Sequence, residues 1–257
     1  MSTARKKSAT APVPVARRKR ATVGRPRKTE GSIDATKRIL DAAEELFSKH
    51  GFDAVTMRAV AALANVDAAL AHYYFDTKKG LFEAVLDRRA GVVFAERMAA
   101  LDLYEAQFGD AVEVEGAVAA FLLPLLEQAN KGDEGWRHYF RLIAHVNNAP
   151  GGGGPSEKAY FDPVVHKLIG VIKRALPDAP EEDLYWCFLF LTGSLTLALS
   201  RTGRIDRLSG GICHSDDLGS LMPRMVKYCT AGFKSVCVSS AKNNSESKLR
   251  RPVSGRR

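Results

Sequence analysis

The sequence predicts an all-α protein of about nine helices, and three observations carry that prediction. From residue 32 to residue 238, apolar side chains recur at spacings of three and four. The segments with this period are separated by short groups of Gly, Pro, Asn and Asp, which end helices and form turns. Sustained alternation of apolar and polar residues, typical of half-buried strands, does not occur in the sequence. With 257 residues, 46% of them hydrophobic, the chain is long enough to bury a sizeable core.

The first helices follow one another closely between residues 32 and 82. An apolar stripe predicts a first helix that begins at Ser32 or Asp34 and ends at Gly51. Two short helices are predicted next, over 57–64 and from 68 to about 74. A long fourth helix then starts at a cap supplied by Asp76 or Thr77.

Residues 56–75 have the physical features of a helix-turn-helix. Asn65 tolerates the positive φ that a tight turn requires, and Asp67 can accept hydrogen bonds from the first N–H groups of the next helix, worth about 1 kcal/mol. On a helical wheel the outward face holds Asn65, Ala68, Ala69, His72 and Tyr73, and the opposite face holds Leu70, Ala71 and Tyr74. Small residues near the start and hydrogen-bonding aromatics near the end suit a helix that enters the major groove of DNA.

The remaining chain continues as helices with clear interruptions. The predicted helices cover residues 112–130, with Pro124 as a kink, 135–147, 161–176, 181–200 and 216–238. The breakers between them lie at 131–133, 150–155, 177–180 and 202–211. We therefore expect a DNA-binding domain over 31–82 and a larger domain over 83–240.

Charge divides the chain into an acidic body and two basic ends. Residues 1–30 carry a net charge of +9 and residues 242–257 carry +5, in a chain whose total is +9, which leaves −5 for residues 31–241. Cationic tails indicate a polyanionic partner, either nucleic acid or a membrane surface. We therefore expect disordered basic segments over 1–30 and 241–257.

Several classes of protein are disfavoured. The basic N-terminal segment lacks the apolar core of a signal peptide. The longest apolar run, residues 186–199, is too short to span a bilayer. The four cysteines show no CxxC or zinc-ligand spacing, and no nucleotide-binding or hydrolase motif occurs. These features predict a cytoplasmic protein that is not an enzyme and has no cofactor, no metal and no membrane partner.

The motif residues of the first four helices match a known pattern. They are Thr36, Arg38-Ile39-Leu40-Asp41-Ala42-Ala43-Glu44, Leu46-Phe47, Gly51-Phe52, Thr56-Met57-Arg58, Asn65-Val66-Asp67, His72-Tyr73-Tyr74-Phe75, Lys78 and Leu81-Phe82. This stretch of about 50 residues resembles the TetR family of bacterial transcriptional regulators. The resemblance implies a helix-turn-helix domain followed by a helical domain for ligand binding and dimerisation.

The resemblance also implies roles for individual residues. Thr56 matches a phosphate contact, Arg58 a contact to phosphate or a base edge, and Lys78 a phosphate contact at the start of the fourth helix. His72 and Tyr73 match the aromatic pair of the recognition helix, while Tyr74 stands where the family usually has a phosphate-binding His. The candidate DNA-contacting residues are Thr56, Arg58, Asp67, Ala68, Ala69, His72, Tyr73, Tyr74, Lys78, Arg25 and Arg27.

Two departures from the family pattern affect how DNA would be read. Asn65 replaces the usual turn glycine, which the turn tolerates. Ala68 and Ala69 cannot hydrogen-bond a base, so direct readout must depend on Arg58, His72, Tyr73 or contacts to thymine methyl groups.

The basic arm contains a short motif of its own. Gly24-Arg25-Pro26-Arg27 resembles the core of an AT-hook, whose arginines lie in a narrow minor groove. The alternative is a solvated tail that adds only salt-dependent attraction to phosphates. Both interpretations stay open on the sequence.

The second domain loosely resembles that of TetR-type regulators linked to fatty-acid metabolism, on Leu176-Pro177, Glu182, Leu184-Tyr185-Trp186, Phe188, Leu191, Gly193 and Ala231-Gly232-Phe233. The resemblance implies that the domain binds a small apolar effector, and an acyl-type compound is one option. Large apolar residues that could line its pocket are Phe94, Met98, Phe121, Leu125, Trp136, Phe140, Phe161, Trp186 and Phe190, with Leu101 and Ile143. The alternative for each is that it simply fills the core. His138, His145 and His166 lack a further ligand at metal-binding spacing.

Dimerisation is expected because half-sites on DNA are read by two-fold dimers. The last two helices offer apolar stripes for a four-helix bundle between two protomers. The candidate interface residues are Leu184, Phe188, Leu191, Leu195, Leu221, Met222, Met225 and Cys229. Burial within one protomer is the alternative.

The sequence thus predicts a homodimeric repressor that binds a palindromic operator on double-stranded DNA and is released by a small apolar effector. When bound to DNA it would associate with the bacterial nucleoid. The alternative is an architectural protein that binds DNA without sequence specificity through its basic tails.

Overall fold

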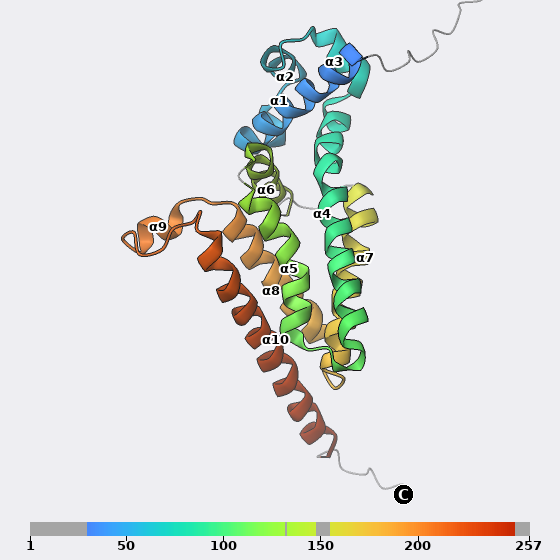
Figure 1. Ribbon diagram of the computed structural model, residues 1–257, viewed down its shortest axis with the longest axis vertical. Coiled ribbons are helices and arrows are strands. Elements are labelled where there is room, and N and C mark those ends of the chain that lie inside the picture. The colour runs from blue at the N-terminus through green and yellow to red at the C-terminus, as the bar shows by residue number, and fades with distance from the viewer. Residues whose placement is uncertain (1–29, 132, 148–154, 250–257) are drawn as a thin grey trace, which may run out of the picture.

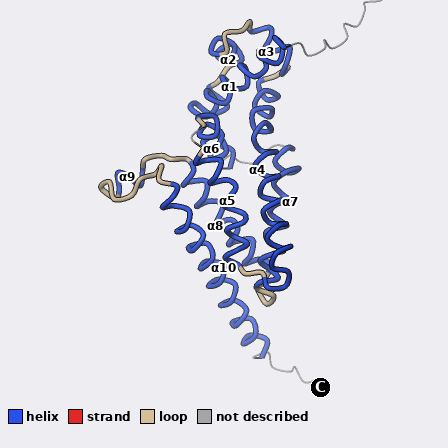
Figure 2. Tube along the Cα trace, viewed as in Figure 1, coloured by secondary structure: helices blue, strands red, loops and turns tan. Residues whose placement is uncertain are grey.

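The computed structural model describes residues 30–131, 133–147 and 155–249, and side chains over 33–131, 133–147 and 161–237. Across these residues the fold is all-α, which confirms the predicted class, and no strand occurs in them (Figure 2). The elements are α1 (Glu30–Ala54), α2 (Met57–Leu63), α3 (Ala68–Phe75), α4 (Lys78–Phe108), a 3-10 turn η1 (Gly109–Ala111), α5 (Val114–Asn130), α6 (Glu134–Asn147), α7 (Pro155–Ala175), α8 (Glu181–Leu199), α9 (Arg204–Leu208) and α10 (Leu218–Leu249).

The elements lie close to their predicted positions, with three differences. Helix α7 begins at Pro155, six residues before its predicted start and at the end of the predicted breaker at 150–155. The short helix α9 forms within the predicted breaker at 202–211, and it projects from the side of the bundle (Figure 1). Helix α10 continues to Leu249, so the predicted domain boundary at 240 falls inside a helix. Helix α1 runs to Ala54, although the backbone of Gly51 is non-helical at φ 75°, and the regular part therefore ends where predicted.

Helices α1–α3 sit at one end of an elongated molecule, and α4 runs from that end along the larger bundle (Figure 1). Helices α5, α7, α8 and α10 form the bundle beside α4, and α6 lies between the bundle and α1. Helix α4 is 31 residues long, so it is the rigid element that belongs to both parts. Any shift of its first turns relative to the bundle must move α1–α3 as well.

The buried residues form two clusters. The smaller cluster joins α1–α4 around Ile39, Phe47 and Val60, and it also includes Leu142 of α6. The larger cluster joins α4–α8 and α10 around residues such as Phe121 and Phe233. Helix α6 therefore contributes side chains to both cores, and this contact ties the small domain to the bundle.

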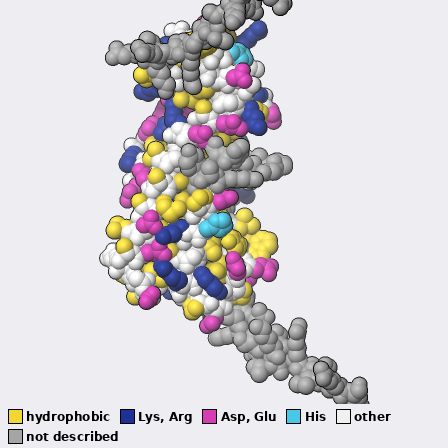
Figure 3. Space-filling view, turned by 90° about the vertical axis from the view of Figure 1, so that its right-hand side faces the viewer, with side chains coloured by type: hydrophobic (Ala, Val, Ile, Leu, Met, Phe, Trp, Pro, Cys, Tyr) yellow, Lys and Arg dark blue, Asp and Glu magenta, His cyan; other side chains and the backbone are white. Residues whose placement is uncertain are grey.

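The surface of the larger bundle is unevenly apolar. A group of hydrophobic side chains protrudes at one edge of its lower half (Figure 3). No helix among the described residues is both long enough and apolar enough to cross a membrane.

Candidate DNA interface and effector cavity

The turn between α2 and α3 is built by the residues that the sequence indicated. Asn65 adopts φ 51°, the left-handed region that asparagine tolerates better than most side chains. The Thr56 hydroxyl accepts a hydrogen bond from Ala59 N at 3.1 Å, and the Asp67 carboxylate accepts one from Ala69 N at 2.7 Å. Both short helices are therefore capped at their N-termini, which stabilises the start of each.

A further clamp on this turn comes from α1. The guanidinium of Arg38 donates from Nη1 to the carbonyl oxygens of Ala64 and Asn65, each at 3.2 Å, and its Nε pairs with Asp34. These carbonyls lie at the end of α2, where they have no partner within the helix. The sequence spacing did not predict the clamp because its partners are 26 and 27 residues away.

Helix α3 presents the predicted outward face. Ala69, His72 and Tyr73 are exposed, Tyr73 to 58%, while Ala71 on the opposite side is fully buried. The His72 ring donates from Nδ1 to the carbonyl oxygen of Asp76 at 3.1 Å, because a carbonyl can only accept. That bond fixes the ring and leaves Nε2 on the exposed side, free to meet a base edge or a phosphate.

The other candidate DNA-contacting residues of α2 and α3 differ in their exposure. Tyr74 is half-buried and packs on the small core, as the helical wheel predicted. The centre of its ring lies 5.4 Å from that of Tyr73. Ala68 is half-buried as well, and Arg58 is exposed at the start of α2. Leu63, an apolar residue of α2, is 48% exposed.

Lys78 is placed differently from the expectation of a free phosphate ligand. Its Nζ donates to the carbonyl oxygens of Phe52 at 3.0 Å and Asp53 at 3.3 Å, and it lies 4.3 Å from the centre of the Phe52 ring. The side chain therefore caps the end of α1 and ties it to α4. A phosphate contact by its remaining donor stays a prediction, and Arg25 and Arg27 lie outside the described residues.

A network of charges links α1, α4 and the start of α6. Glu44, whose side chain is 2% exposed, accepts hydrogen bonds from Arg88 and from Arg89, the latter at 2.7 Å from its Nε. Arg89 also pairs with Asp133 at 3.5 Å, and its guanidinium lies 4.7 Å from the Trp136 ring. The two arginines thus link α4 to α1 and to the start of α6, and of the carboxylates that they contact only Glu44 is buried.

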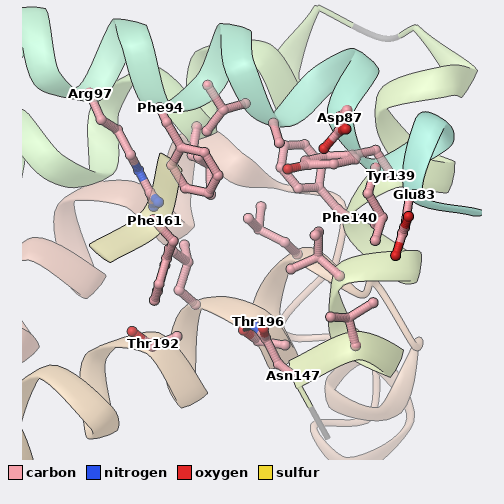
Figure 4. A pocket seen from close by; sticks show the side chains of 18 of the residues that line it. Glu83, Asp87, Phe94, Arg97, Tyr139, Phe140, Asn147, Phe161, Thr192 and Thr196 are labelled. Carbon is pink, nitrogen blue, oxygen red and sulfur yellow. Dashed lines mark hydrogen bonds between the residues drawn. The ribbon is translucent and has the colours of Figure 1, made fainter. Parts of the chain in front are cut away.

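A cavity of about 530 Å³ extends from the small domain into the bundle. At the end near α1 it is lined by Phe52, Lys79 and Glu83, and at the far end by Arg97 and Thr192. Of the predicted pocket residues, those that line it are Phe94, Phe121, Leu125, Phe140 and Phe161, with Ile143 (Figure 4). Its walls are mainly aromatic and aliphatic, as in sites that bind small molecules.

Four predicted pocket residues do not line this cavity. Trp186 and Phe190 are 50% and 55% exposed because they lie on the outer side of α8. Trp136 stacks on Phe140 and beneath Arg89, and Met98 packs on the core. Leu101, also named at the sequence level, is fully buried in the core.

The predicted dimer stripe also requires correction. Leu184, Leu191, Leu195, Met225 and Cys229 are buried within the protomer, between α8, α10 and their neighbours. Phe188, Leu221 and Met222 are partly buried against the same core. The five buried residues already pack inside one chain, whereas a place for the three partly buried ones at a dimer interface stays a prediction.

A different stripe of α8 is exposed. Its members share one face of the helix at 100° per residue, and they are Tyr185, Trp186, Leu189, Phe190 and Leu197. Tyr228 of α10 is 66% exposed. A helix with apolar residues all round has one face for the protomer core and a second face that is left without cover.

The histidines and cysteines of the described chain do not gather into a cluster of the metal-binding kind. No group of three or more His, Cys, Asp or Glu side chains within it could hold a metal ion. Burial raises the pKa of the Cys229 thiol to about 11 and that of Cys237 to about 12, so both stay protonated and act as small apolar groups. Burial also lowers the pKa of His138, and the nearby Glu45 and Glu44 carboxylates oppose this.

Two sequence families match the chain. Residues 39–85 match the family described as "Bacterial regulatory proteins, tetR family", and residues 119–232 match "Tetracyclin repressor-like, C-terminal domain". Among curated proteins, the HTH-type transcriptional regulatory protein RaaS of Mycobacterium tuberculosis is 42% identical over 69 residues, 27% of this chain and 32% of that protein. The uncharacterised HTH-type transcriptional regulator YhgD of Bacillus subtilis is 43% identical over 54 residues, 21% of this chain and 28% of that protein. The matches span about a third of the length of these relatives.

Solved structures share the fold over most of the chain. A TetR-like transcriptional regulator from Rhodococcus sp. RHA1 has a TM-score of 0.51 at 20% identity, covering 80% of this chain and all of that one. SmeT, the repressor of the SmeDEF multidrug efflux pump of Stenotrophomonas maltophilia, has a TM-score of 0.52 at 19% identity, covering 75% of this chain and 90% of its own. At such identities the likeness concerns the arrangement of helices alone.

Proposed function

Because the chain belongs to the TetR family of transcriptional regulators, we propose that it is a homodimeric repressor released from a palindromic operator by a small, mainly apolar effector. Regulators of this family are ligand-responsive DNA-binding proteins. The observation that carries the proposal is the cavity, because its lining includes α1 and the first turns of α4, the elements that also support the helix-turn-helix.

The exposed face of α3 is the proposed reading surface. His72 and Tyr73 provide hydrogen-bonding groups, and the methyl group of Ala69 allows the helix backbone to approach the groove closely. Arg58 and the capped N-terminus of α2 lie beside it and suit phosphate contacts. Because few of these groups are charged, sequence preference would come from shape and single hydrogen bonds.

Replacing His72 with alanine is expected to weaken operator binding by about 10-fold to 100-fold, the cost of one lost base contact in each half-site. The matched control is His166→Ala, because His166 is an exposed histidine on α7 in the larger bundle. An operator selected in vitro from random DNA, followed by gel-shift titration at fixed salt, provides the measurement. Equal affinity in both variants would contradict the assignment of α3. Binding that shows no sequence preference would favour the architectural alternative.

The cavity suggests how an effector would act. Its lining takes residues from α1 (Phe52), α4 (Phe82, Leu86), α6 (Phe140) and α8 (Leu195). A ligand that fits better when α4 is displaced from α6 would shift the population towards that arrangement. The displacement would change the distance between the two recognition helices of a dimer, and thus lower affinity for the operator.

The exposed stripe of α8 is the proposed dimer interface, with a second copy of this chain as its occupant. A palindromic site requires a two-fold pair, and the stripe places Trp186, Leu189 and Phe190 on a face that the protomer leaves exposed. Aromatic residues of this kind commonly dominate the stability of protein interfaces.

Leu189→Glu is expected to raise the dissociation constant of the dimer by about 10-fold to 100-fold, since a carboxylate would be buried without a partner in each half. Leu103→Glu is the matched control, because Leu103 is similarly exposed on α4 but lies outside the stripe. Sedimentation equilibrium of the two variants gives both constants. A dimer that tolerates Leu189→Glu as well as Leu103→Glu would exclude this face.

A further inference from the structure

The far end of the cavity contains a buried positive charge without a negative partner. Arg97 of α4 is 3% exposed, and no acidic side chain within the described part of the chain forms an ion pair with it. Its Nε donates to the carbonyl oxygen of Phe121 at 2.9 Å, and its guanidinium lies 3.9 Å from the centre of the Phe121 ring. Its Nη2 is buried and has no hydrogen-bond partner.

A buried cation in this condition is costly, because burial removes the water that would otherwise solvate it. That loss lowers the pKa of Arg97 to about 9. The side chain therefore remains charged near neutral pH, and it gains most from an anion that enters the cavity. A protein that needed only packing here could use leucine or methionine, which carry no such cost.

A second unsatisfied polar atom lines the same cavity. The Thr192 hydroxyl of α8 is buried and has no hydrogen-bond partner. Arg97 reaches down from α4 and Thr192 lies on α8 at the same end of the cavity in this view, while Glu83 and Asp87 lie at the opposite end (Figure 4). One end of the cavity thus offers hydrogen-bond donors, and the acidic groups of the lining are kept away from it.

We propose that the cavity binds an amphipathic carboxylic acid, with the carboxylate held by Arg97 and Thr192 and the hydrocarbon part packed between Phe94, Phe140 and Phe161. The inference rests on the proposed function in taking this cavity as the effector site, and it adds a charged head to an effector otherwise described as apolar. A guanidinium Nη2 and a hydroxyl are both donors, and a carboxylate has two oxygens that accept. The aromatic walls suit an apolar chain.

The test uses two probes of equal chain length, decanoate and 1-decanol, which share the hydrocarbon part and differ in charge. Calorimetric titration of the full chain without DNA is expected to show decanoate binding about 10-fold to 100-fold more tightly than 1-decanol. Arg97→Met keeps the length of the side chain and removes the charge. It should abolish this preference, with the affinity for 1-decanol unchanged or increased. Arg97→Lys should retain part of the preference, and Thr192→Val should reduce decanoate affinity by about 5-fold.

The controls separate this inference from the proposed function. Thermal unfolding shows whether Arg97→Met is folded, and its stability should equal or exceed that of the parent chain because a buried charge is removed. An equal affinity for both probes in the parent chain, no binding of either, or a preference that survives Arg97→Met would overturn the carboxylate site. Gel-shift titration of the operator with decanoate is a separate measurement. Tight, Arg97-dependent binding of decanoate that leaves operator affinity unchanged would retain the carboxylate site and refute release by an effector in this cavity.

Discussion

Glu44→Gln is expected to lower the free energy of unfolding by about 3 kcal/mol, because it removes one partner of a buried ion pair and leaves the others in place. The carboxylate accepts from Arg89 at 2.7 Å and 3.2 Å, and from Arg88 as well. A glutamine side chain has the same shape, but its amide N–H₂ would point at a guanidinium donor and satisfy nothing. Two positive charges that are mostly buried would then lack their main counter-charge, although Arg88 would keep Asp41 at 2.6 Å and Arg89 would keep Asp133 at 3.5 Å.

The matched control is the neighbouring residue. Glu45 pairs with Lys49 one turn away on the surface of α1, and that hydrogen bond lowers the pKa of Glu45. Exposed pairs of this spacing contribute about 0.3 to 0.5 kcal/mol, so Glu45→Gln should leave stability nearly unchanged. Urea unfolding followed by circular dichroism compares the two variants. Equal losses in both would mean that the network at Glu44 is no stronger than a surface pair.

The helix-turn-helix could be predicted from sequence because its determinants are local. The caps at Thr56 and Asp67, and the positive φ of Asn65, involve partners no more than three residues away. For the same reason the wheel of α3 correctly placed Ala71 inside and His72 and Tyr73 outside. Local interactions within one turn determine such features, and tertiary packing does not change them.

The faces of α8 could not be predicted in this way. Its sequence is apolar nearly all round, so the stripe through Leu184 and Leu191 and the stripe through Trp186 and Phe190 fit a helical period equally well. Only packing against α6, α7 and α10 decides which face is inside. The outcome placed the leucine stripe inside and exposed the aromatic residues, opposite to both predictions made for these residues.

The positions of buried polar groups are even harder to predict from the sequence, because their partners lie far away along the chain. In the sequence, Arg97 looks like any other charged residue of a long helix. In the structure it is buried and donates a hydrogen bond to a carbonyl oxygen 24 residues away. Glu44 meets partners 44 and 45 residues away. Nothing in the local spacing distinguishes these side chains from solvated ones, although Arg97 lines the cavity and Glu44 lies at the domain junction.

Phe47→Ala tests whether the two cores unfold separately, and it is expected to cost about 3 to 5 kcal/mol in the stability of the small domain. Phe47 is fully buried in the core of the small domain. The centre of its ring lies 5.1 Å from that of Phe82 and 6.1 Å from that of Phe52. The matched control is Phe233→Ala, since Phe233 is equally buried but belongs to the core of the bundle. Amide hydrogen exchange resolves the effect of each variant by segment.

Helix α6 decides the interpretation, because Leu142 packs in the small core while Trp136 and Phe140 pack in the large one. Phe47→Ala should reduce protection in α1–α3 and in α6, and leave α5 and α8 as they were. Phe233→Ala should do the reverse, with α6 again affected. Protection lost evenly along the chain in both variants would show a single cooperative unit, in which α6 has no special part. Protection lost as expected would identify α6 as the element that couples the two cores. Because Phe140 and Ile143 of this helix also line the cavity, the stability of the DNA-binding domain would then be linked to the occupancy of the cavity.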